Sequence, residues 1–209
     1  VGDNVGVGCI SDGCLNCTTC EKGDEQYCLG GKSVHTYNDK KRYTHLGGNP
    51  DQHTFGGYSG SNVIHEHFVM KIPEGLPADK VAPILCAGIT MYDPLKYHGA
   101  TKGVKMTIGI VGVGGLGTMG IKLAKALGHT VIAISTNADK KEMALSKGAD
   151  EFIVSSDPES MALRKGELNL ILNTVAAEHE VAHYLSLLKY NGTIVQLGLV
   201  KDLHTVNQL

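Results

Sequence analysis

The sequence predicts a two-part α/β protein, with a doubly wound parallel sheet in its C-terminal part and a β-rich N-terminal part that carries a cysteine lobe. A short apolar run, Ile108–Val111, leads straight into a glycine motif and then into a helical stretch. Strand-like and helix-like segments alternate from there to residue 199. Four of the six cysteines lie between residues 14 and 28. These three observations define the expected fold.

Composition is that of an ordinary globular protein. Of the 209 residues 42% are hydrophobic and 19% charged, and the net charge is −2. A charge so close to zero gives no reason to expect nucleic acid or an anionic membrane as a partner. No apolar run approaches the roughly 18 residues of a membrane span, and no signal peptide opens the chain. We therefore expect a cytoplasmic protein with a small-molecule substrate.

The first ten residues alternate small and β-branched side chains, which predicts a strand ending at Cys9 and Ile10. The cysteine lobe follows with the pattern Cys14-x2-Cys17-x2-Cys20-x7-Cys28. Two-residue spacings let neighbouring thiolates reach one metal, and the fourth closes a tetrahedron. The spacing favours zinc, with disulfides or an iron–sulfur cluster as alternatives. Because four protein ligands fill the site, the zinc is expected to be structural.

Residues 29–62 are rich in turn formers, including Gly47-Gly48-Asn49-Pro50 and Gly56-Gly57, and predict loops with short strands. The pattern of residues 63–69 predicts a strand with two solvated imidazoles, His65 and His67. Metal binding by that pair is the alternative, but it lacks a third ligand nearby. The other histidines considered are predicted to lie on the surface or in loops: His35, His45, His53, His98 and His129.

Cys86 lies in the apolar stretch 84–92, which follows Pro77 and Pro83 and a short helix start around Asp79. A cysteine in the first turn of a helix has its thiolate favoured by the helix dipole. A small buried side chain in the core is the equally common alternative. The residues alone leave both readings open.

The glycine motif Gly112-x-Gly114-x-x-Gly117 connects a strand to a helix over 118–127. The first glycine allows a tight turn, the second lets backbone approach a pyrophosphate, and the third lets helix and strand pack closely. The free N–H groups of the helix start then hold the phosphate. The predicted dinucleotide-binding turn comprises Gly112, Val113, Gly114, Gly115, Leu116 and Gly117.

Alternation continues beyond this helix and predicts the rest of the parallel sheet. The expected strands cover residues 130–135, 151–155, 168–172 and 193–199, and the expected helices cover 139–147, 158–165 and 178–189.

The end of the second strand predicts the cofactor. An acidic residue there would bind the ribose 2′-hydroxyl of NAD, but the sequence has Ser135-Thr136-Asn137, with Lys140 and Lys141 close behind. Hydroxyls and cations suit a 2′-phosphate, and Asp139 is expected to open the next helix instead. The pattern therefore favours NADP, with Ser135, Thr136, Asn137 and Lys140 as its contacts.

Together these motifs make the sequence similar to the zinc-containing, medium-chain alcohol dehydrogenases, and most to their cinnamyl alcohol dehydrogenase branch. The matching stretches are the opening Val-Gly-Asp-x-Val-Gly-Val-Gly-Cys, the cysteine lobe, Thr-Phe-Gly-Gly-Tyr-Ser, Leu-Cys-Ala-Gly-Ile-Thr-x-Tyr, the glycine motif and Leu-Ser-Lys-Gly-Ala-Asp. The resemblance implies part of a GroES-like β-barrel catalytic domain over 1–85, with its structural zinc lobe at 14–28. It implies an NADP-binding Rossmann domain over 86–209.

The resemblance also implies site residues. Cys14, Cys17, Cys20 and Cys28 would hold the structural zinc, and Cys86 would be a ligand of the catalytic zinc. Further cofactor contacts would come from Thr90, Thr174, Val175 and Gly192, besides the glycine turn and the Ser135–Lys140 region. The implied reaction moves hydride between NADP(H) and a primary alcohol or aldehyde, in a homodimer.

The sequence departs from the family pattern at both ends. The family's first catalytic-zinc cysteine and its Gly-His-Glu segment precede the part that matches Val1, and a last cofactor strand follows the part that matches Leu209. We therefore expect an internal segment of a longer enzyme that, by itself, binds one zinc and turns over no alcohol. The alternatives are a zinc-free quinone or enone reductase of the same superfamily and a non-catalytic NADP-binding protein.

Overall fold

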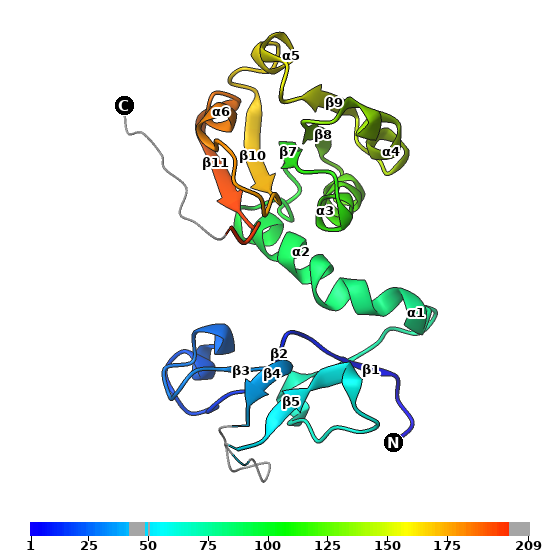
Figure 1. Cartoon of the computed structure of the whole chain (residues 1–209), viewed down its shortest axis with the longest axis vertical. Helices are drawn as coiled ribbons and strands as arrows, with labels where there is room; N and C mark the ends of the chain where they lie inside the picture. Colours follow the sequence, from blue (N-terminus) through cyan, green and yellow to red (C-terminus); the bar gives the residue numbers. More distant parts are fainter. Residues whose placement is uncertain (42–48, 50, 201–209) are drawn as a thin grey trace. The chain divides into compact units, whose positions relative to one another are not determined.

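The computed structural model describes residues 1–41, 49 and 51–200. It divides into two compact units, Val1–Cys86 and Ala87–Leu209, and each is described here by itself (Figure 1). The predicted turn at Gly47, Gly48 and Pro50, as well as His45, lies outside the described residues. None of the helices that the described residues form is long and apolar enough to cross a membrane.

A five-stranded parallel sheet forms the centre of the second unit. Its strands are β7 (Thr107–Val111), β8 (Thr130–Ser135), β9 (Glu151–Val154), β10 (Leu168–Asn173) and β11 (Leu188–Gln196). They lie in the order β11-β10-β7-β8-β9. The chain winds from β7 toward β8 on one side and later returns to β10 on the other, so the winding direction reverses beside β7. In such sheets ligands bind at that reversal, outside the carboxyl ends of the strands.

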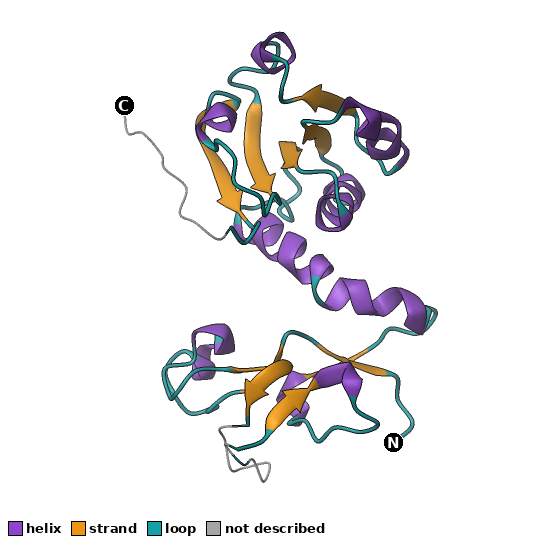
Figure 2. Ribbon diagram, in the orientation of Figure 1, coloured by secondary structure: helices purple, strands orange, loops and turns teal. Residues whose placement is uncertain are grey.

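Helices cover both faces of this sheet (Figure 2). α2 (Ala87–Tyr97), α3 (Gly115–Ala126) and α4 (Lys141–Ser146) pack on one face through an apolar core that contains Met91, Ile121 and Ala144. α5 (Pro158–Ala162) and α6 (Ala182–Leu185) pack on the other face through a core that contains Met161 and Tyr184. Burial on both faces explains the continuous apolar strands, and the predicted doubly wound fold is confirmed.

Two predictions for the second unit are wrong at its C-terminal end. The helix expected over 178–189 is a single turn, α6. The His179 side chain forms hydrogen bonds with the Asn173 side chain and the Ala177 carbonyl, and these hold the segment before α6 in a loop. The strand expected from residue 193 begins at Leu188, so Gly192 lies inside β11 rather than before it. Smaller differences affect the helix expected over 139–147, which begins as the 3-10 turn η7 (Ala138–Lys140), and the helix from Pro158, which ends at Ala162.

The sequence predicts His129 on the surface or in a loop; it lies in the loop before β8, but it is buried rather than on the surface. Its side chain is only 2% exposed. Nδ1 accepts a hydrogen bond from the Met106 backbone N–H at 3.2 Å, so Nε2–H donates to the Ala100 carbonyl at 2.8 Å. The imidazole thereby ties the start of β8 to the segment that precedes β7.

The first unit is built from short antiparallel strand pairs and 3-10 turns. β1 (Val5–Val7) pairs with β6 (Val69–Lys71), β2 (Ile10–Asp12) with β3 (Val34–His35), and β4 (Tyr37–Lys40) with β5 (His53–Phe55). The connecting turns are η1 (Cys20–Lys22), η2 (Glu25–Tyr27), η4 (Gly56–Tyr58), η5 (Glu66–Phe68), η6 (Ala82–Leu85) and the short helix α1 (Ala78–Val81).

The two strands predicted in this unit from sequence differ from those observed. The strand expected over residues 1–10 is divided between β1 and β2. The strand expected over 63–69 is wrong for most of its length, because η5 occupies Glu66–Phe68. The His65 side chain accepts a hydrogen bond from the His67 backbone N–H at 3.2 Å, and this local cap competes with an extended strand.

Candidate metal lobe and dinucleotide site

The four cysteines of the lobe converge on one point. Their sulfur atoms all lie within 4.8 Å of one another, and the sulfurs of Cys14 and Cys20 are 3.9 Å apart. Four Zn–S bonds of about 2.3 Å in a tetrahedron would place the sulfurs roughly 3.8 Å apart, whereas a disulfide needs about 2.05 Å. None of the four cysteines forms a disulfide. The geometry fits a tetrathiolate metal site and does not fit disulfides.

Tight turns bring these sulfurs together. Gly23, with φ of +80°, follows η1 and reverses the chain, and η2 then leads to Cys28. The Leu29 backbone N–H donates to the Cys17 sulfur at 3.3 Å, a bond that favours the thiolate form. A side chain at Gly30 would meet the Cys14 sulfur at 2.5 Å, so the lobe closes only over a glycine. Sequence reasoning missed Gly30, although its position two residues after Cys28 offered a signal.

The thiols of the lobe differ strongly in acidity. The Thr19 hydroxyl, 3.2 Å from the Cys17 sulfur, is the main cause that lowers the pKa of Cys17 to about 5. Burial is the main cause that raises the pKa of Cys20 to about 12, and its hydrogen bond with Cys17 adds to the effect. Sulfurs this close cannot all carry negative charge by themselves. A divalent cation among them would remove that penalty, and the donor set therefore fits zinc.

The histidine pair does not form a metal site in the part of the chain that the structure describes, where the four cysteines are the only converging group of three or more ligands. The Nε2 atom of His67 instead lies 2.6 Å from the Glu25 carboxylate, in the lobe. This contact fastens the lobe to the segment that contains η5.

Cys86 is the last residue of the first unit and directly precedes α2. Its side chain is exposed, which contradicts the core alternative, and its thiol shares a hydrogen bond with that of Cys9. Thr90 lies one helical turn further along, inside α2, and is half-buried.

The glycine turn has the geometry that its motif predicts for a phosphate cradle. Gly112 has φ of +90°, and a side chain there would meet the Thr174 hydroxyl at 2.7 Å. A Cβ on Gly117 would overlap the Gly112 carbonyl oxygen, whereas one on Gly114 would meet nothing within 4 Å. Among the described residues no side chain caps α3, so its first amides are open to an anion. The turn therefore fits a pyrophosphate.

The other three turn residues have different roles. Val113 is buried and Leu116 partly buried in the core beneath α3, so only their backbones could face a ligand. A Cβ on Gly115, like one on Gly114, would meet nothing within 4 Å. The open side of the turn therefore runs along these two glycines.

Hydrogen bonds shape the end of β8, where the 2′-phosphate is expected. Ser135 is 7% exposed, and its hydroxyl oxygen accepts a hydrogen bond from the Asn137 N–H at 3.2 Å. The Asn137 side chain accepts from the Asp139 N–H at 2.8 Å and so caps η7, a role that we expected of Asp139 itself. Thr136 is exposed and Lys140 half-exposed at the same strand end. The last residue of β8 is Ser135, so this position carries a hydroxyl and not the carboxylate that an NAD site would have.

Thr174 and Val175 lie beside the glycine turn, at the end of β10. The Thr174 hydroxyl hydrogen is shared between the carbonyls of Val111, at 2.8 Å, and Gly112, at 3.1 Å. Sequence reasoning missed Gly198, whose N–H donates to the Asn173 carbonyl at 3.1 Å and where a Cβ would overlap the Val175 backbone.

Gly192, which the resemblance implies as a cofactor contact, does not join these residues. The residue after it, Thr193, pairs with Leu170, while the turn follows Val111, which pairs with Asn173. Gly192 therefore lies toward the opposite, amino end of the sheet. A Cβ there would come within 2.9 Å of two backbone carbonyl oxygens, so packing within the sheet requires this glycine.

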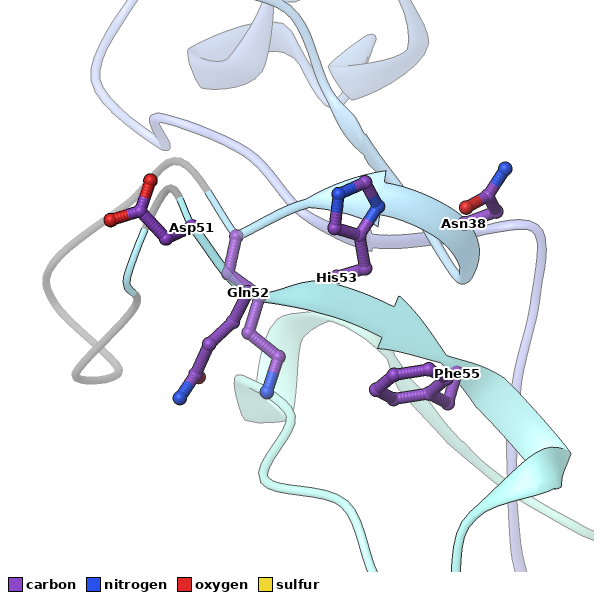
Figure 3. Close-up of a pocket in the computed structure, with 6 residues that line it drawn as sticks. Asn38, Asp51, Gln52, His53 and Phe55 are labelled. Carbon is purple, nitrogen blue, oxygen red and sulfur yellow. The ribbon is translucent and has the colours of Figure 1, made fainter.

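A surface pocket of about 700 Å³ lies along the β4–β5 pair of the first unit and is lined by Asn38, Lys41, Asp51, Gln52, His53 and Phe55. Figure 3 shows the labelled side chains pointing in different directions. They do not converge on one point, and the pocket does not qualify as a catalytic site.

Comparison with known proteins identifies several similar proteins that are named as dehydrogenases. Residues 115–208 match the zinc-binding dehydrogenase family. A mannitol dehydrogenase of Petroselinum crispum is 49% identical over 95% of this chain and 56% of its own length. The structure of a cinnamyl alcohol dehydrogenase from Sorghum bicolor superposes with a TM-score of 0.90 at 39% identity, covering 99% of this chain and 57% of that one. CAD from Helicobacter pylori, solved with NADP(H), has a TM-score of 0.82 at 38% identity, covering 96% and 54%.

These matches define the class that the chain resembles: residues 115–208 match the zinc-binding dehydrogenases, and nearly the whole chain is similar to the dehydrogenases named above. Within that class it is similar to the cinnamyl and mannitol dehydrogenases, as its motifs predicted. The chain spans about half the length of the curated relatives that it matches.

Proposed function

We propose that the full-length protein is a zinc-dependent oxidoreductase that moves hydride between NADP(H) and a primary alcohol or aldehyde. The observation that carries this proposal is the presence, in one chain, of a converging four-cysteine lobe and an open dinucleotide turn. Relatives named for the same activity support it. An NADP-binding protein without catalysis would need neither the lobe nor an exposed cysteine at position 86.

The cysteines would have two separate roles. Cys14, Cys17, Cys20 and Cys28 would hold one zinc that keeps the lobe folded, because four protein ligands leave no position for substrate. Cys86, exposed ahead of α2, would be a ligand of a second zinc. When bound, that zinc supplies Lewis acidity toward the substrate oxygen, and the nicotinamide supplies or accepts the hydride.

The remaining site residues would bind and orient the cofactor. The amides of the glycine turn would hold the pyrophosphate, and the end of β8 would receive the 2′-phosphate through Ser135, Thr136, Asn137 and Lys140. Thr90, Thr174 and Val175 would line the remainder of the cofactor site. We leave Gly192 out of this set.

The proposal extends to the cellular location and the assembly of the full-length protein. The lobe cysteines form no disulfide, which suits a reducing compartment and supports the cytoplasm. We propose a homodimer, as the family resemblance implies.

Aldehyde reduction tests the proposal. Purified full-length protein should oxidise NADPH when cinnamaldehyde is added, and a zinc chelator should abolish this activity until zinc is restored. Turnover of a quinone or enone that survives complete zinc removal would instead favour the zinc-free reductase.

A further inference from the structure

Asn173, the last residue of β10, is the centre of a side-chain network that the dinucleotide motif does not include. Its side chain is fully buried. The amide nitrogen donates to His179 Nε2 and to Gln196 Oε1, both at 2.7 Å. The amide oxygen accepts from the Val175 backbone N–H at 3.2 Å. Both amide hydrogens and the oxygen of a buried group are therefore engaged.

The partners of His179 determine its tautomer. Nδ1 lies 2.7 Å from the Ala177 carbonyl oxygen, which can only accept, so Nδ1 carries the hydrogen. Nε2 then carries no hydrogen and can accept a hydrogen bond from the Asn173 amide.

This network connects three backbone segments beside the glycine turn. Val175 and Ala177 belong to the loop after β10, and Gln196 ends β11, which lies next to β10 (Figure 1). The Gln196 amide donates in turn to the Gly198 carbonyl at 3.3 Å. The loop containing Val175 and the turn at Gly198 thus have their spacing fixed through Asn173.

The position of the network identifies the part of the cofactor that it would serve. A doubly wound sheet binds a dinucleotide with one half of the molecule on each side of the strand-order reversal. The β8 side receives the adenosine ribose, so the β10–β11 side faces the nicotinamide. Asn173 lies on that side, next to Val111 at the end of β7.

We propose that His179 is a positioning residue for the nicotinamide end of the cofactor, acting through Asn173 on the backbone at Val175 and Gly198. This inference rests on the proposed function. His179 itself need not touch the cofactor. Its acceptor nitrogen holds the Asn173 amide in the orientation that fixes both segments.

Three variants separate this role from general packing. His179→Phe removes the acceptor but keeps a ring beside Tyr184, whose centroid lies 6.0 Å away. His179→Gln restores an acceptor near the position of Nε2. His183→Phe is the matched control, because its imidazole is 65% exposed and pairs only with Glu180 among the contacts described.

Two ligands then distinguish the two ends of the cofactor site. NADPH binding to the full-length protein is followed by the fluorescence of the reduced nicotinamide, and 2′-phospho-ADP-ribose, which lacks that ring, is titrated as a competitor. We expect His179→Phe to weaken NADPH binding about tenfold, or about 1.4 kcal/mol, and to leave 2′-phospho-ADP-ribose within twofold. His179→Gln should recover most of the loss, and His183→Phe should match the unmodified protein.

Each other result overturns the inference in a recognisable way. Equal weakening of both ligands would show a merely structural role for His179. Unchanged NADPH affinity in His179→Phe would remove the positioning role and leave the proposed function intact. Failure of the unmodified protein to bind NADPH would overturn both.

Discussion

At the scale of single residues, the two site glycines Gly114 and Gly117 are needed for different reasons. Gly117 is needed for folding, because a Cβ there would overlap the Gly112 carbonyl. Gly114 has open space around it and is needed only if a ligand approaches its backbone. Within one turn, Gly117 therefore matters for stability and Gly114 for ligand binding.

Alanine at each position should show this separation. Gly117→Ala should lower the free energy of unfolding by about 1–3 kcal/mol, because the turn must shift to relieve overpacking. Gly114→Ala should unfold at the same denaturant concentration as the unmodified protein but bind NADPH more weakly. Chemical denaturation and fluorescence titration measure the two effects, and normal NADPH affinity in Gly114→Ala would argue against a pyrophosphate at the turn.

Ser135→Asp should reverse or erase the cofactor preference. The carboxylate would place negative charge beside the 2′-phosphate, whose proposed charge-assisted contact with Lys140 would be worth about 1.5–3 kcal/mol. We expect NADP affinity to fall by roughly one to two decades, while NAD affinity holds or rises. Ser135→Ala, which adds no charge, is the control. Equal affinity of the unmodified protein for both cofactors would contradict the NADP assignment.

At the scale of elements, prediction from sequence succeeded where the hydrophobic periodicity and the turn-forming residues agree. The bounds of β7–β10 match the expected strands within one residue, because apolar runs buried on both faces leave one structural solution. It failed over 178–189 and 63–69, where side chains bond to nearby groups instead. Such competition depends on exact geometry rather than on pattern.

We propose that a metal holds the cysteine lobe together, and Cys17→Ser tests this. With three thiolates left, zinc content should fall well below one per chain and the lobe should unfold locally, since ligand binding supplies its folding energy. Cys9→Ser, a change outside the lobe, should leave the zinc content of the protein unchanged. Elemental analysis and limited proteolysis near Gly23 measure both effects. Full zinc retention in Cys17→Ser, or iron in the unmodified protein, would contradict the assignment.

At the scale of the whole molecule, the sequence predicts which chemistry is present better than it predicts how the sites are supported. The cysteine spacing and the glycine motif are local, so both were visible before the fold was known. Gly30, Gly198, Asn173 and His179 were not, because their importance comes from contacts that folding creates. Gly192 was misplaced because a glycine between predicted elements looks like a turn wherever it lies.

Hydride transfer from NADPH is the central claim for the full-length protein, and isotope labelling tests it most directly. NADPH deuterated on the transferred face of its C4 carbon is incubated with cinnamaldehyde, and the alcohol is analysed by mass spectrometry. The proposed function predicts one deuterium at the carbinol carbon of the product, lost when the assay is run in the presence of a zinc chelator. Alcohol that carries only solvent hydrogen, or no alcohol at all, would contradict it.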